Sequence, residues 1–204
     1  MSSRIKTTIY KFVNRIGLKN RNFTIVSNNC WGGFIYQRYG LQYRTPFIGL
    51  FIFAPDYIKL LQNLEGYLKK DLEFIDFYTS KYIGEITKKD NYKEYPIAIL
   101  GDIEIHFLHY KNNQDALEKW ERRLERVNYN NMLVKFSDRD LCNDKLIESF
   151  DKLPFKNKLC ITAKKYDLES VVQFDIFESK EYVENEWDYV DRYLNIKQII
   201  NNLK

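Results

Sequence analysis

Few of the residues that build metal centres, disulfides or flexible linkers occur in this 204-residue sequence, which has three cysteines, two histidines, four prolines and eight glycines. Cys30, Cys142 and Cys160 are odd in number and are not spaced as metal ligands, so we expect reduced thiols and no zinc site. No run approaches the ~20 apolar residues of a membrane-spanning helix, and the N-terminus lacks the apolar core of a secretory signal. These absences predict a cytoplasmic protein, at most peripheral at the inner membrane face, for which no cofactor is expected.

Acidic residues are missing from the first 55 positions, and the first one is Asp56. The same segment carries eight basic residues, namely Arg4, Lys6, Lys11, Arg15, Lys19, Arg21, Arg38 and Arg44. A segment of one charge sign predicts contact with an anionic partner, such as phosphate groups, acidic lipid or an anionic polymer. The alternative is a basic surface that pairs with the acidic remainder of the chain. Specific binding of nucleic acid is not expected.

The chain divides into an N-terminal segment, residues 1–20, and a single α/β domain, residues 21–204. Five apolar residues recur at near-helical spacing among the basic ones of residues 4–18, namely Ile5, Ile9, Phe12, Val13 and Ile16. This spacing predicts a basic amphipathic helix. Such a helix either lies on an anionic membrane surface or packs its apolar face on its own domain.

Strands and helices alternate along the rest of the chain. Strands are expected at residues 22–26, 132–136, 158–164 and 170–178, and on both sides of Gly101 within 95–110. Helices are expected at residues 33–41, 56–75, 113–127, 144–154 and 186–203, and a hairpin or loop at 77–94. This alternation predicts an α/β fold with a mixed or parallel central sheet flanked by helices.

The stretch "SNNCWGG", residues 27–33, leaves the first expected strand and opens a helix. Loops at this place carry ligands in α/β sheets, and the positive end of a helix dipole favours the thiolate of Cys30, the nucleophilic form. Gly32 and Gly33 allow a substrate to approach the backbone, or N–H groups to face an oxyanion. The alternatives are a buried structural cysteine or a turn that cradles phosphate. The remaining residues of the turn are candidates for substrate binding: Ser27, Asn28, Asn29 and Trp31.

Both histidines lie in "DIEIHFLHY", residues 102–110, within an expected strand. A thiol nucleophile needs a base that accepts its proton and later returns it, and the pKa of imidazole suits that role. Alternation along a strand places His106 and His109 on opposite faces, so one of them is expected to serve. We predict His109 as the base because it lies nearer the end of the strand. His106 is then a candidate for substrate binding, and the structural alternative is that both imidazoles are satisfied by hydrogen bonds in a half-buried strand.

The stretch "KFSDRD", residues 135–140, ends another expected strand. A carboxylate there, from Asp138 or Asp140, would orient the imidazole and complete a nucleophile, base and orienter. The same Asp-x-Asp pair is of the kind that holds a divalent cation beside a sugar nucleotide. The structural alternative is a loop in which the two acids pair with Arg139.

A helix is expected to carry "KWERRLER", residues 119–126, with basic residues on adjacent turns. Because the guanidinium group grips carboxylate or phosphate at two points, Arg122 and Arg123 are candidates for binding an anionic substrate. The alternative is a solvated helix face, in which Glu118 and Arg122 form a favourable pair four residues apart.

Four stretches together resemble a bacterial family known as domain of unknown function 1919, often labelled exopolysaccharide or capsule biosynthesis protein. They are "SNNCWGGFIYQRYGLQYRTPFIGLFI", "YPIAILGDIEIHFLHY", "ALEKWERRLERVNYNNMLVKFSDRD" and "LPFKNKLCIT", and they cover most of residues 22–165. The resemblance implies a setting in the assembly of cell-surface polysaccharide and no particular reaction.

The order of a strand, a cysteine at a helix start, "GLQYRTPF", a strand histidine and a helix with "RRLER" is similar to papain-like cysteine peptidases and acyltransferases. This similarity implies that Cys30 is the nucleophile and His109 the base, in a Rossmann-like or papain-like-variant layering. The chain has "TPF" where that group favours "PFDW", and the third catalytic residue is not placed by the similarity.

The leading hypothesis is a Cys-dependent acyltransferase or hydrolase that acts on a saccharide or on an activated acyl or sugar donor. Cys30 and His109 would carry it, with Asp138 or Asp140 as orienter. One alternative is a nucleotide-sugar-dependent glycosyl- or phosphoryl-transferase, in which the two acids would bind a divalent metal. The other is a non-enzymatic factor that binds an anionic polymer or, through residues 1–20, a membrane surface.

Overall fold

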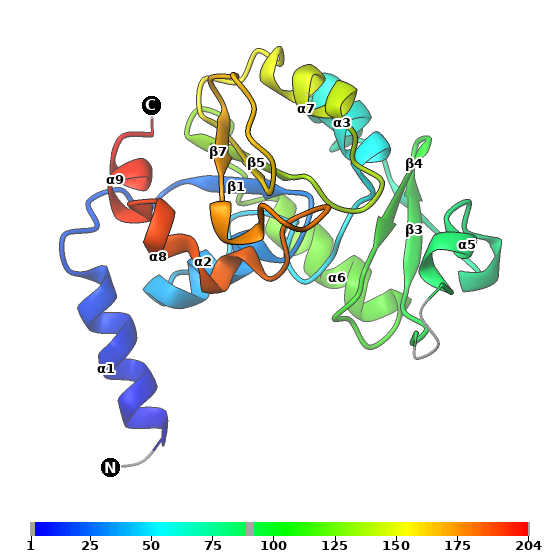
Figure 1. Cartoon of the computed structure of the whole chain (residues 1–204). Helices are drawn as coiled ribbons and strands as arrows, with labels where there is room; N and C mark the ends of the chain where they lie inside the picture. Colours follow the sequence, from blue (N-terminus) through cyan, green and yellow to red (C-terminus); the bar gives the residue numbers. More distant parts are fainter. Residues whose placement is uncertain (1–2, 89–91, 204) are drawn as a thin grey trace.

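Two sheets form the frame of the protein in a computed structural model that describes residues 3–88 and 92–203 (Figure 1). The first sheet is parallel, with the order β1 (Thr24–Ser27), β5 (Met132–Ser137), β6 (Lys158–Thr162) and β7 (Val171–Gln173). The second is antiparallel, with the order β2 (Leu72–Ile75), β3 (Ile97–Leu100) and β4 (Ile103–His106). The predicted α/β class is confirmed.

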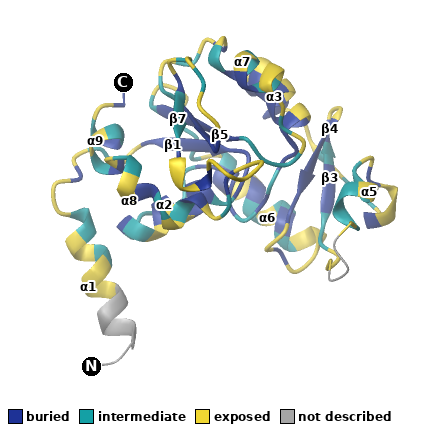
Figure 2. Ribbon diagram, in the orientation of Figure 1, coloured by how far each residue is buried: buried dark blue, intermediate teal, exposed yellow. Residues whose placement is uncertain are grey.

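Helices cover both faces of the parallel sheet. One face packs against α2 (Trp31–Tyr39), α8 (Val190–Tyr193) and α9 (Ile196–Asn201), and the other against α3 (Ala54–Gln62) and α7 (Asp144–Asp151). The chain enters β5 from α6 (Asn113–Leu124), and the shorter helical elements are α4 (Leu64–Tyr67), α5 (Ile83–Ile86), and the 3₁₀ helices η1 (Phe77–Thr79), η2 (Asp175–Phe177) and η3 (Glu186–Asp188). Strands β1 and β5 are therefore buried along their whole length and β6 nearly so, whereas the edge strand β7 is half-buried (Figure 2).

Strand β5 carries the two halves of the core. Leu133 points into the cluster under α2, whereas Val134 and Phe136 point into the cluster under α3 and α7. Every residue of β5 is buried, and this includes Lys135. A strand buried on both faces usually consists of apolar residues, so a lysine in its middle indicates a partner inside the protein.

Several predicted elements are shorter or differently arranged. The helix expected over 56–75 ends at Gln62, and Leu72–Ile75 instead pairs with β3, because sheet pairing overrides the local helical spacing. Within the described part of residues 77–94, η1 and α5 replace the expected hairpin or loop. The expected terminal helix is broken into η3, α8 and α9.

Two glycines stand where the chain must turn with a positive φ. Gly40 (φ +57°) ends α2, as predicted, and Gly101 (φ +71°) joins β3 to β4. Positive φ is sterically costly for residues with a Cβ. Both turns therefore require the residue that the sequence supplies.

Helix α1 (Ser3–Arg15) confirms a helix in the N-terminal segment and lies beside α2 (Figure 1). Residues 1–2 of that segment and the side chains of residues 3–7, Ile5 among them, lie outside the described residues. In the described chain, none of the helices combines the length and apolar character needed to cross a bilayer.

Candidate functional site

The segment of residues 48–53 joins the two sheets and brings their ends together. The backbone N–H of Ile52 donates to the carbonyl oxygen of Asn28, just after β1, at 2.9 Å. The backbone N–H of Phe51 donates to the carbonyl oxygen of His106, the last residue of β4, at 2.9 Å. The histidines were expected on a strand of the central sheet. They lie instead at the end of β4 and on the turn after it, in the antiparallel sheet, and this connecting segment links them to the end of β1.

Cys30 and His109 line one cavity of about 310 Å³. Cys30 is the residue before α2, and His109 lies on the turn that follows β4. The cavity is of the size that small ligands occupy. Cys30 and the more distal histidine thus line the same cavity, and their action as nucleophile and base stays a prediction.

The thiol of Cys30 is largely buried, which changes its acidity. Burial, reinforced by the negative charge of Glu186, raises the pKa of Cys30 to about 11. The Sγ atom lies 3.9 Å from the carbonyl oxygen of Leu50, toward which it donates. Burial thus opposes the predicted shift toward thiolate at the helix terminus: a thiol with this pKa holds its proton at neutral pH, and attack requires a base.

Gly49 fixes the backbone of His109. Its carbonyl oxygen accepts the His109 N–H at 3.0 Å, and its φ is +69°. A Cβ added at Gly49 would lie 3.3 Å from the Cβ of His109. This position therefore needs glycine twice, for its backbone conformation and for the close approach of the imidazole-bearing residue.

Two cations border the same cavity. Arg123 is buried, and its Nη1 donates to the hydroxyl of Tyr110 at 2.6 Å. Lys119 pairs with Asp115 at 2.7 Å and lies over the Tyr110 ring, 5.3 Å from its centroid. Because these groups stand at the wall of a cavity, they favour a ligand with a negatively charged group.

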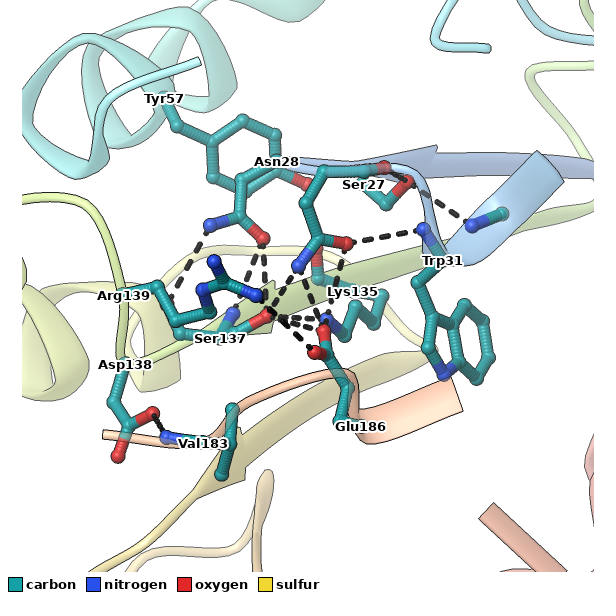
Figure 3. Close-up of polar contacts among 12 residues, drawn as sticks. Ser27, Asn28, Trp31, Tyr57, Lys135, Ser137, Asp138, Arg139, Val183 and Glu186 are labelled. Atoms are coloured by element: carbon teal, nitrogen blue, oxygen red, sulfur yellow. Dashed lines mark hydrogen bonds and ion pairs between the residues drawn. The ribbon is translucent and has the colours of Figure 1, made fainter. Parts of the chain in front are cut away.

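Behind the Cys30 loop lies a buried polar network (Figure 3). Lys135 and Glu186 form an ion pair in which both side chains are fully buried. The Asn29 amide donates to Glu186 Oε1 at 2.7 Å and to Ser137 Oγ at 2.9 Å, and the Ser137 hydroxyl donates to Glu186 Oε1 at 2.9 Å. The network therefore ties the turn after β1, strand β5 and the segment before α8 to one another.

Burial disfavours the charged forms of both Lys135 and Glu186. Although burial on its own raises the pKa of Glu186, Lys135 lowers it to about 2. Burial lowers the pKa of Lys135, and the attraction of Glu186 only partly offsets that effect. With a pKa of about 2, Glu186 is a carboxylate at neutral pH, and the ammonium form of Lys135 beside it offsets that buried charge. We therefore describe the pair as ionised. Neither residue was singled out in the sequence; a lysine inside the apolar run "MLVKF" was the available signal.

With this geometry in hand, comparison with known proteins gives the family. The family model "Domain of unknown function (DUF1919)" matches residues 1–203. The chain belongs to the DUF1919 family. An uncharacterized protein of Haemophilus influenzae is 36% identical to it over 170 residues, which is 80% of this chain and 76% of that protein. The predicted resemblance to DUF1919 is confirmed, and these comparisons name no activity.

The polar residues of the "SNNCWGG" turn point inward in this DUF1919 protein. Ser27, Asn28, Asn29 and Trp31 are buried. The Ser27 hydroxyl donates to the Asn29 carbonyl at 2.8 Å, and Asn29 Oδ1 accepts the Trp31 N–H at 3.1 Å. These contacts favour a role in holding the Cys30 loop over the predicted role in binding substrate.

The two glycines of the turn serve different purposes. A Cβ at Gly32 would lie 3.0 Å from Ile25 Cγ2, so glycine at this position allows α2 to pack closely on β1. The N–H of Gly32 donates to Ser27 Oγ at 3.4 Å. Gly33 borders the cavity. Of the two glycines whose amides were predicted to stabilise an oxyanion, Gly33 is the one that lines the cavity, and the role of its N–H stays a prediction.

His106 is enclosed by aromatic rings and does not border the cavity. It is fully buried, stacks on Phe51 at a centroid distance of 4.7 Å and lies edge-on to Phe53. Burial lowers the pKa of His106 to about 3. Its Nδ1 lies 3.4 Å from the Tyr95 hydroxyl, but its buried Nε2 has no hydrogen-bond partner among the described residues, so the structural alternative of a fully satisfied imidazole is met at one nitrogen only. The substrate-binding role of His106 stays a prediction.

Asp138 connects two loops through its carboxylate. Oδ1 accepts the backbone N–H of Val183 at 2.9 Å, and Oδ2 accepts that of Ala163 at 2.6 Å. Asp140 adopts a positive φ of 54°, and its carbonyl oxygen accepts the N–H of Ala54 at 2.9 Å. These contacts give Asp138 a structural task, so the orienter of His109 stays a prediction. No group of three or more His, Cys, Asp or Glu within the described ranges is placed to hold a metal ion.

Proposed function

We propose that this DUF1919 protein is a thiol-dependent acyltransferase or hydrolase in which Cys30 is the nucleophile and His109 the general base. The observation that supports the proposal is the shared cavity, into which separate elements bring one thiol and one imidazole. The setting in bacterial cell-surface polysaccharide biosynthesis rests on the sequence resemblance alone.

Because the pKa of Cys30 is high, the thiol would have to lose its proton to a base during the attack on the acyl donor. His109 takes the thiol proton as Sγ attacks the carbonyl carbon, and the imidazolium then returns that proton to the leaving group. Water, for hydrolysis, or a saccharide hydroxyl, for transfer, next attacks the thioester and gives its proton to His109. The sulfur leaves as thiolate and regains a proton from the imidazolium, so the enzyme ends as it began.

The cations at the cavity wall suggest the kind of acyl donor. A donor with a carboxylate or phosphate group would place that group against Arg123 or Lys119 while its carbonyl faces Cys30. The engaged carboxylate of Asp138 favours this chemistry over the alternative of a metal-dependent nucleotide-sugar transferase.

An activated ester tests the proposal without knowledge of the natural donor. Incubation with p-nitrophenyl acetate should add one acetyl group to the peptide that contains Cys30, as detected by mass spectrometry. The variant Cys30→Ala should lose this adduct, and His109→Gln should slow its formation by about a hundredfold or more. Cys142→Ala is the matched control, because Cys142 is also a half-buried free thiol and lies outside the cavity. An adduct that persists in Cys30→Ala would refute the nucleophile.

A further inference from the structure

Helix α1 is oriented with its apolar side chains toward solvent. Ile9, Phe12, Val13 and Ile16 are between 46% and 66% exposed, and we call these four residues the α1 stripe. Arg15 of the same helix is turned toward the protein: it donates from Nε to the carbonyl oxygen of Tyr39 at 2.9 Å and from Nη2 to that of Gly40 at 2.8 Å. For these four described residues, the alternative in which the apolar face packs on its own domain is therefore wrong.

This inverted arrangement leaves an apolar row that suits a partner. Single exposed apolar residues are ordinary, but a contiguous row of them marks a surface that binds something apolar. The residues follow the spacing i, i+3, i+4, i+7, so Ile9, Phe12 and Val13 lie on one face of α1 and Ile16 follows directly after the end of the helix. The α1 stripe is thus an apolar surface that the described chain leaves uncovered.

Beside the stripe runs a groove of about 720 Å³ between α1, α2 and the end of α6. Five cations line it, and we call it the cationic groove: Lys11, Arg15, Arg122, Arg123 and Arg126. Its described lining includes no carboxylate. The contacts of Arg15 and Arg126 go to carbonyl oxygens, and that of Arg123 goes to a hydroxyl, so no acid of the described residues neutralises their charges.

The stripe and the groove meet at Phe12, which belongs to both. An anionic polymer would neutralise the groove and leave the stripe in water. A second copy of this chain would cover the stripe but would bring two cationic grooves toward each other. An anionic bilayer surface satisfies both features, because it offers phosphate groups at the level where apolar side chains enter the acyl region.

We propose that the α1 stripe and the cationic groove together bind the surface of an anionic phospholipid bilayer, with lipid phosphates in the groove and α1 lying in the interface. The inference does not depend on the chemistry of Cys30. The groove shares Gln37, Tyr43 and Arg123 with the Cys30 cavity, so this surface would set the cavity beside the membrane.

Flotation of the full chain with lipid vesicles tests the proposal. The chain should bind vesicles of phosphatidylcholine with phosphatidylglycerol at least tenfold more than vesicles of phosphatidylcholine alone. Binding should weaken between about 0.1 M and about 1 M salt, as the Debye length falls from about 10 Å to about 3 Å. Equal binding to both vesicles, or none, would overturn the proposal.

Two variants separate the contributions. Lys11→Gln/Arg122→Gln/Arg126→Gln should weaken binding to the anionic vesicles on the order of a hundredfold, at about 1 kcal/mol per cation. Phe12→Ser/Ile16→Ser changes only exposed side chains and should also reduce it at least tenfold. The matched controls are Lys145→Gln/Lys164→Gln/Lys165→Gln and Ile176→Ser, which remove exposed cations and an exposed apolar residue that line neither groove nor stripe. They should bind as the unmodified chain does.

The two other partners, an anionic polymer and a second copy of the chain, predict results that contradict the membrane proposal. Dextran sulfate that binds as tightly as the vesicles and is unaffected by Phe12→Ser/Ile16→Ser would identify an anionic polymer and overturn the membrane proposal. Dimerisation in sedimentation that the same variant abolishes, without vesicle binding, would identify a second copy and overturn it as well.

Discussion

Cys30 and His109 are held by neighbouring carbonyl groups of one buried segment. The carbonyl oxygen of Gly49 accepts the His109 N–H at 3.0 Å, and that of Leu50 lies 3.9 Å from Cys30 Sγ. The relative position of thiol and imidazole therefore depends on the conformation of two adjacent residues, Gly49 and Leu50. A change that shifts this segment should disturb the pairing without touching either reactive group.

The substitution Gly49→Ala tests this dependence most directly, because it changes the segment at the residue that contacts His109. The positive φ costs about 1–2 kcal/mol for a residue with a Cβ, and the new methyl group would press on the Cβ of His109. We expect a loss of about 1–2 kcal/mol of unfolding free energy and at least a tenfold slower acetylation of Cys30. Gly84→Ala is the control, since no atom lies within 4 Å of its added Cβ and its φ is not positive. Urea unfolding and acetylation kinetics measure both effects; an unchanged acetylation rate would show that Gly49 does not position His109.

The reactivity of Cys30 should follow its raised pKa. Because the pKa rises from about 9 to about 11, the thiolate fraction at neutral pH is about a hundredfold below that of an unperturbed cysteine. Alkylation of Cys30 by iodoacetamide should therefore be about a hundredfold slower than that of a free thiol at pH 7. It should accelerate about tenfold per pH unit toward pH 11. Peptide-resolved mass spectrometry gives the rate, and fast labelling at neutral pH would instead indicate a preformed thiolate.

The parts of this arrangement that the sequence predicted depend on local patterns. The turn at Gly40 and strand β5 follow from spacing and residue type. The preference for His109 over His106 as the base stays a prediction, although His109 is the histidine that lines the cavity. Parallel pairing of β1 with β5 also placed the two predicted polar loops at one edge of the sheet, with Ser27 opposite Lys135.

The rest depends on contacts that no local pattern encodes. Leu72–Ile75 has a helical context and becomes a strand only because β3 offers a partner. The burial of Asn29 follows from the pair between Lys135 and Glu186, residues 51 positions apart in the chain. The amphipathic spacing of α1 was correct, but spacing alone does not say which face meets the protein.

Single and double variants should show how much the ion pair of Lys135 and Glu186 contributes to the free energy of unfolding. Lys135→Met leaves an isolated carboxylate in the interior, which should cost about 3–5 kcal/mol of unfolding free energy. Lys135→Met/Glu186→Gln removes both charges and should recover at least half of that loss. Arg192→Met/Asp175→Asn is the control pair, because both side chains are more than half exposed and such pairs contribute about 0–1 kcal/mol. Urea denaturation of the original chain and of the six variants, single variants at all four positions included, measures the coupling. Single variants at 135 and 186 that lose less than about 1 kcal/mol would show that water or a rearrangement solvates the remaining charge.

His106 should make the protein less stable as the pH falls below about 6.5. In the unfolded chain an imidazole binds a proton near pH 6.5, whereas burial lowers the pKa of His106 in the folded protein to about 3. Between these values the unfolded state holds the extra proton, so the unfolding free energy decreases by about 1.4 kcal/mol per pH unit as the pH falls. Above about pH 6.5 neither state is protonated there, and the contribution of His106 to the pH dependence disappears.

His106→Phe should remove this slope, because the ring is already packed among aromatic residues and no proton can bind to its replacement. The charged groups near the imidazole do not reverse the direction: Glu104 lies 3.6 Å from Nε2 but already accepts the Ser80 hydroxyl at 2.6 Å, and Lys81 opposes protonation. The difference in unfolding free energy between the original chain and His106→Phe, measured from pH 7 to pH 4.5, isolates the effect from other titrations. In His109→Gln the single remaining imidazole should keep its neutral-form NMR shifts down to about pH 4.5. A ring that titrates near pH 6.5 would show that water or Glu104 stabilises the imidazolium inside the aromatic enclosure.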